Sequence, residues 1–83
     1  MGKLLVIKKR DTEQLRLAES VEGASILLLQ DGVYLAADKI RAKVYASAVD
    51  AERRGVKLSG AQSVSYAEIV GLMLEQGHTV VNL

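Results

Sequence analysis

The sequence predicts an α/β fold, a three-layer α/β/α sandwich around a mostly parallel sheet of four or five strands. Continuous apolar runs without polar alternation recur along the chain, which is typical of strands covered on both faces. The segments between these runs are rich in helix formers and long enough for parallel crossovers. Because 83 residues leave room for one hydrophobic core, we expect residues 1–83 to form a single domain.

The first two strands are expected at the two longest apolar runs. These are residues 4–7, with the sequence LLVI, and residues 25–29, with the sequence SILLL. Residues 13–19 between them favour a helix. A hairpin is the weaker alternative, because about 17 residues separate the runs and a parallel crossover needs a dozen or more. We therefore expect a right-handed strand–helix–strand unit.

The middle of the chain is predicted to add two helices and two strands. An amphipathic helix that faces the sheet is predicted over residues 32–40. On such a helix the apolar side chains form a stripe about 100° wide, made by Val33, Ala36, Ala37 and Ile40. A third strand is expected over residues 42–46. A short helix over residues 47–54 then ends at Gly55, and a brief strand follows near residues 62–65.

The last part of the chain is predicted to form a helix and a terminal strand. Residues 66–76 have Ser65 as N-cap and Glu68 three residues later, the spacing of a capping box. Gly77 is the expected C-cap. Residues 79–81, with the sequence TVV, form the final strand.

Composition excludes several classes of function. Eleven basic and ten acidic residues give a net charge of +1, so we expect no direct binding of nucleic acid. The sequence has no cysteine, which excludes disulfides, thiolate metal sites, thiol nucleophiles and a persulfide carried on these residues. No run approaches the roughly 18 apolar residues of a membrane span, and no signal-peptide pattern is present. We expect a cytoplasmic protein without membrane contact.

Ligands of open parallel sheets bind beyond the carboxyl ends of the strands. There, Asp31 is expected to cap the helix that begins at Gly32, with the glycine making a tight turn. A phospho-acceptor role for Asp31 is disfavoured, because Lys8, Lys9 and Arg10 follow the first strand where a magnesium site needs acids. Lys8 and Lys9 are weak candidates for anion binding, since a short charge run is usually a solvated turn.

No residue pattern indicates catalysis, a metal site or a cofactor. His78 is the one histidine, has no metal-ligand spacing and is expected in a turn. The serines lack the G-x-S-x-G motif, and residues 55–60 lack the G-K-[ST] ending of a P-loop. An unaided enzyme is therefore not expected.

Apolar residues exceed what one core requires. In the last helix they span about 200°, twice the arc that covers one sheet face: Ile69, Val70, Leu72, Met73 and Leu74. Leu17, Tyr34 and Leu35 point away from the stripes of their own predicted helices. Single exposed leucines are common, but the set together favours a subunit interface. We assign this interface to Tyr34, Leu35, Ile69, Leu72 and Met73.

Several of these segments also match a known family. They are LLLQDGV at residues 27–33, KVYA at 43–46, Asp50 with RGV at 54–56, and VSYAEIV at 64–70. In this order and spacing they resemble the TusB/DsrH family. The resemblance covers about residues 23–83, roughly three-quarters of the chain.

The resemblance implies a DsrEFH-type domain in a sulfur-relay assembly with TusC/DsrF-like and TusD/DsrE-like subunits. Assemblies of the TusBCD kind pass persulfide sulfur toward 2-thiolation of the wobble uridine of tRNA, and those of the Dsr kind serve sulfur oxidation. The catalytic cysteine of such a relay belongs to the TusD/DsrE-type subunit. Many DsrH chains also carry an early cysteine, which residues 10–19 lack here. The Ser-Pro that often follows the first strand and the tryptophan that often ends relatives are absent too.

Composition and resemblance together predict a non-catalytic subunit of a sulfur relay. Two alternatives stay open at this level. One is a module that binds a small anion or ligand at the strand ends through Lys8, Lys9, Asp31 and Ser47. The other is a homo-oligomeric structural protein without a sulfur role.

Overall fold

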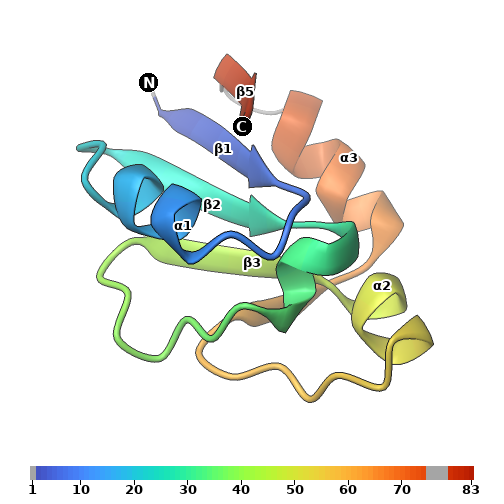
Figure 1. The fold of residues 1–83 in the computed structure, drawn as a ribbon. Coiled ribbons are helices and arrows are strands. Elements are labelled where there is room, and N and C mark those ends of the chain that lie inside the picture. The colour runs from blue at the N-terminus through green and yellow to red at the C-terminus, as the bar shows by residue number, and fades with distance from the viewer. Residues whose placement is uncertain (1, 75–78) are drawn as a thin grey trace.

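The computed structural model describes residues 2–74 and 79–83. Five strands lie in one sheet, and every neighbouring pair is parallel (Figure 1). In the spatial order of the sheet the strands are β4 (Gln62–Val64), β3 (Lys43–Ser47), β2 (Ala24–Leu28), β1 (Lys3–Ile7) and β5 (Thr79–Asn82). The predicted α/β fold with a parallel sheet is confirmed.

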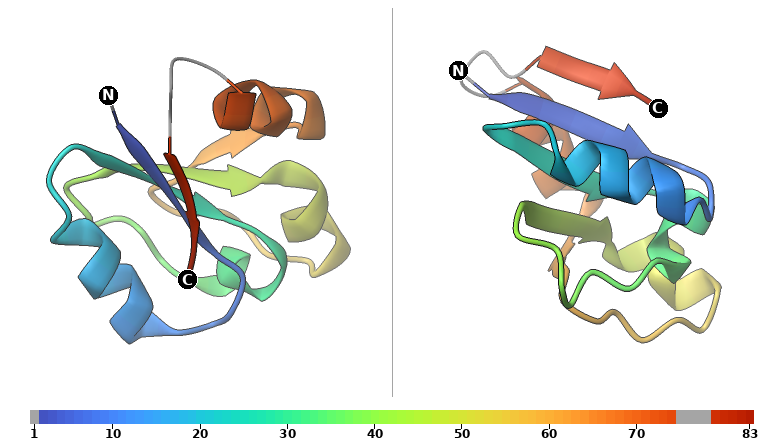
Figure 2. Two further views of the ribbon diagram at one scale, coloured as in Figure 1. Left: turned by 90° about the horizontal axis from the view of Figure 1, so that it is seen from above. Right: turned by 60° about the vertical axis from the view of Figure 1, so that its left-hand side comes forward.

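Helices lie on both faces of this sheet, which gives three layers (Figure 2). One face is covered by α1 (Thr12–Glu19) and the 3-10 helix η1 (Gln30–Tyr34), and α2 (Ala48–Arg53) adds Ala51 to the same core. On the other face, α3 (Tyr66–Leu74) is the helix that the described residues form. From β1 to β4, each strand lies next to the strand that precedes it in the sequence. Strand β5 then lies on the other side of β1.

Alternate strand residues build two separate cores. On the α1 side the strands contribute Leu5, Ile7, Ala24, Ile26, Leu28, Val44 and Ala46. On the α3 side they contribute Leu4, Val6, Leu27, Tyr45 and Val64. Both faces of the central strands are therefore dry, and this explains why their sequences are apolar without alternation.

The helix ends follow the local signals in the sequence. The Ser65 hydroxyl accepts a hydrogen bond from the Glu68 N–H at 3.2 Å, and the Glu68 carboxylate accepts one from the Ser65 N–H at 2.9 Å. This reciprocal pair confirms the predicted capping box of α3. Gly55, with φ +64°, follows α2 as predicted. Gly77 and His78 lie outside the described residues.

The amphipathic helix predicted over residues 32–40 is wrong. After η1 the backbone becomes extended, with φ −74° and ψ 132° at Leu35. Burial alternates in this extended stretch: Leu35 and Ala37 are buried, while Ala36 between them is exposed. The Ala37 N–H donates to the Ser59 carbonyl at 3.0 Å, so a contact with a distant loop replaces the bond that a helix would form internally.

Candidate functional site

Asp31 lies at the carboxyl edge of the sheet but does not cap a helix. The helix η1 begins after Leu29, which makes no side-chain capping bond, and Asp31 lies inside it. The predicted N-cap role is therefore wrong. The Asp31 carboxylate instead accepts a hydrogen bond from Arg54 Nε at 2.9 Å. This bond raises the pKa of the Arg54 guanidinium above its ordinary value, so the guanidinium keeps its positive charge.

Gly32 is required for close packing and not for a tight turn. It is buried within η1, and a Cβ at this position would overlap the carbonyl oxygen of Ile7 at the end of β1. Its backbone is not in the left-handed region. Gly32 is thus necessary for a reason other than the predicted one: η1 and β1 approach each other too closely for any side chain at this position.

Asp50 was part of the family resemblance in the sequence, but no role was predicted for it at this edge. It is 6% exposed. Its carboxylate accepts hydrogen bonds from the Gln30 N–H at 2.9 Å and from the Tyr66 hydroxyl at 3.5 Å. Its own N–H donates to the buried Ser47 hydroxyl at 3.2 Å. Asp50 therefore ties η1, α2 and the start of α3 together at the strand ends.

A local signal for Asp50 exists in the sequence. Ser47 and Asp50 have the spacing of an N-cap residue and an acid three positions later. The same spacing, between Ser65 and Glu68, did identify the start of α3. What the spacing does not show is that Asp50 reaches Gln30, a residue with the unusual φ of +49°. The carboxylate holds the backbone there, so its oxygens serve structural contacts.

The structure does not assemble the proposed anion site at this edge. Lys8 and Lys9 are exposed. Ser47, however, is fully buried and engaged with Asp50, and Asp31 is paired with Arg54. Two of the four side chains in that hypothesis are therefore already committed to the fold.

The predicted interface residues divide between core and surface. Leu35 is 7% exposed and belongs to the core on the α1 side, so its predicted outward position is wrong. Ile69 is buried on the α3 side, where Leu72 and Met73 are half-buried against the same core. Of this set, Tyr34 is exposed.

Helix α3 turns a different apolar set outward. Tyr66, Val70 and Leu74 are 51%, 54% and 80% exposed. Because residues four apart lie one above the other on a helix, these three form one continuous row. We call them the α3 row. The surplus apolar arc predicted for this helix is thus present, and its exposed part is the α3 row. On the opposite side of the molecule, Leu17 is also exposed, as predicted.

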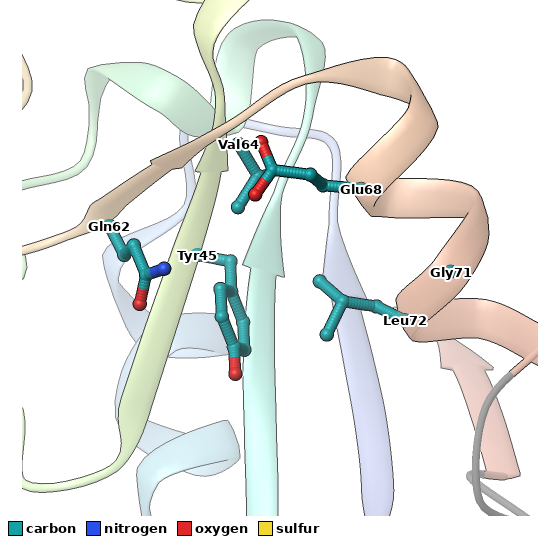
Figure 3. Close-up of a pocket in the computed structure, with 6 residues that line it drawn as sticks. All are labelled: Tyr45, Gln62, Val64, Glu68, Gly71 and Leu72. Carbon is teal, nitrogen blue, oxygen red and sulfur yellow. The ribbon is translucent and has the colours of Figure 1, made fainter.

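A cleft of about 330 Å³ lies beside α3, above the β3–β4 side of the sheet (Figure 3). It is lined by Tyr45, Gln62, Val64, Glu68, Gly71 and Leu72. Gly71 stands in the middle of α3, and a Cβ there would meet no atom within 4 Å. This part of the helix surface is therefore open on the side next to the α3 row.

Residues 2–74 and 79–83 contain neither a candidate metal site nor a candidate membrane span. No three histidine or acidic residues in this part of the chain are placed to hold a metal ion. None of its helices has the length and apolar character needed to cross a membrane.

Together these features define a small all-parallel α/β domain whose acidic groups at the strand ends are held in structural contacts. A family model described as DsrH like protein matches residues 9–79 of the chain. The chain belongs to this family, as the resemblance predicted. No curated protein and no solved structure gives a significant match.

Proposed function

We propose that the chain is a non-catalytic subunit of a sulfur-relay complex. Membership of the DsrH-like family supports a place in such a relay. The observation that carries the non-catalytic role is the absence of cysteine from the 83 residues, because persulfide transfer needs a thiolate. A cysteine-bearing TusD/DsrE-like subunit then performs the transfer, with a TusC/DsrF-like subunit completing a cytoplasmic assembly. The sulfur that this assembly transfers serves either 2-thiolation of the tRNA wobble uridine or sulfur oxidation.

The α3 row is the surface that we assign to docking on a sister subunit. Its three side chains are each at least half exposed, and no charged residue interrupts the row. Covering them stabilises a complex by about 3 kcal/mol, if each contributes about half of the 1.5–3 kcal/mol of a fully buried side chain. The row is small for a complete interface, so the neighbouring cleft joins it in the proposal.

The test is reconstitution with the two sister subunits. We expect the wild-type chain to co-elute with them, and Val70→Glu to abolish co-elution because it places a charge in the dry centre of the contact. Val70 is 54% exposed, so the variant should fold. Size-exclusion chromatography with light scattering gives the mass of each complex.

Leu17→Glu is the control, because Leu17 is even more exposed, at 67%, but lies on α1, across the sheet. This variant should assemble normally. If Val70→Glu also assembles normally, the α3 row is not the docking surface. If the wild-type chain fails to join the sister subunits at all, the relay role itself is wrong.

A further inference from the structure

Strand β5 forms an open edge of the sheet. It pairs with β1 on one side, and no described residue pairs with its other side (Figure 2). Proteins usually protect such edges with lysine, proline, a bulge or a covering segment. The β5 sequence TVVN has neither charge nor proline. By these criteria β5 is an unprotected template for another strand.

The hydrogen bonds of β5 show which backbone groups are free. The Thr79 N–H donates to the Gly2 carbonyl at 3.1 Å, and the Leu83 N–H donates to the Val6 carbonyl at 2.9 Å. The backbone N–H and C=O groups of residues two apart in a strand point to the same side, so those of Val81 also face β1. The N–H and C=O groups of Val80 and Asn82 therefore face outward, toward the open edge.

We propose that β5 pairs antiparallel with β5 of a second copy of this chain, which joins two sheets into one. A strand that pairs with its own copy across a two-fold axis must run antiparallel. Directly opposed residues also point to the same face of the sheet. If the axis passes beside Val81, Val80 lies opposite Asn82 of the second copy, and all outward N–H and C=O groups of both residues are paired.

The side chains of β5 fit this register. Val81 then meets Val81 of the second copy at a non-hydrogen-bonded position, where the two side chains come closest. Leu83 lies opposite Thr79 on the same face. Val81 and Leu83 line a groove of about 230 Å³ between β5 and α1, whose one charged residue is Lys3. No like charges are opposed along the strand, and this favours a second copy over a charged partner segment.

The proposal differs from the docking of α3 and does not depend on it. The α3 row lies on a helix over one sheet face, whereas the β5 contact is made by the backbone at the sheet edge. The two contacts are therefore separable by mutation. A single chain can make both at once.

The isolated chain provides the test. Its mass by light scattering should rise from 9.0 kDa toward twice that value as its concentration increases from about 1 μM to about 1 mM. Asn82→Pro removes the outward N–H from both symmetric pairs and should weaken association at least about tenfold. Proline is tolerated at this position, because the bond that it removes is not used in the monomer.

Asn82→Ala is the matched control, since it removes the same side chain but keeps the N–H, and it should associate like wild type. Hydrogen exchange provides a second readout in the unmodified protein: protection of the Val80 and Asn82 amides should increase with concentration. A chain that stays monomeric throughout would overturn the proposal. So would a dimer that survives Asn82→Pro, or one that Val70→Glu abolishes, because the contact would then lie elsewhere.

Discussion

The two faces of the sheet are covered to different extents. On the α1 side, two helices, η1 and the extended segment after η1 supply a broad core. On the other side α3 is the one described helix, and it buries Ile69 while leaving the α3 row in solvent. Apolar side chains on the first face therefore contribute to the stability of the single chain. Those of the α3 row are free to contribute to association.

The largest effect that distinguishes the two faces is expected from a pair of truncations. Leu35→Ala should lower the free energy of unfolding by about 2–4 kcal/mol, because it leaves a cavity in the α1-side core. Val70→Ala should change it by less than about 0.5 kcal/mol, since that side chain is half in water already. Urea denaturation followed by circular dichroism measures both. Equal effects would mean that α3 is covered in the isolated chain.

A smaller effect is expected at the carboxyl edge. Asp50→Ala leaves the Gln30 N–H and the Tyr66 hydroxyl without their acceptor, and should cost about 2 kcal/mol of unfolding free energy. Asp31→Ala removes an exposed ion pair with Arg54 and should cost under about 1 kcal/mol. Thermal unfolding of the two variants side by side tests this order. The reverse order would assign the structural role to Asp31.

The strands were predictable from sequence because both of their faces are buried. A strand of this kind is apolar throughout, so residues 4–7 and 25–29 need no alternation to be recognised. The start of α3 was predictable because both partners of its capping box, Ser65 and Glu68, are local. These signals do not depend on how distant parts of the chain meet.

The segment after β2 was mispredicted because two periods fit it. Val33 and Ala37 satisfy a helical stripe, and together with Leu35 they equally satisfy the alternation of an extended chain. The contact that decides between them joins Ala37 to Ser59, which lies 22 residues further along. No local pattern contains that information.

The outward residues of α3 were mispredicted for a similar reason. An apolar arc of about 200° contains several possible core-facing stripes, and the choice depends on how the helix is rotated against the sheet. Ile69 faces the sheet, so Val70 faces solvent. The Asp50 contacts likewise join residues 30, 47, 50 and 66, and only the fold brings these together.

The smallest expected effect is that of Gly71→Ala, whose sign is opposite to the much larger effect of Gly32→Ala. Gly71→Ala should raise the unfolding free energy of the isolated chain by about 0.5–1 kcal/mol, because alanine favours a helix interior and its Cβ would meet no atom. Gly32→Ala should lower it, since the new Cβ would overlap the Ile7 carbonyl. Melting temperatures of both variants give the signs.

Gly71 also connects this last measurement to docking. It lies on α3 between the cleft and the α3 row, where an added methyl group would hold an approaching backbone away. A variant that is more stable alone but binds the sister subunits less tightly would show that the open surface at Gly71 is used by a partner. A variant that is more stable and binds equally well would restrict the contact to the α3 row itself.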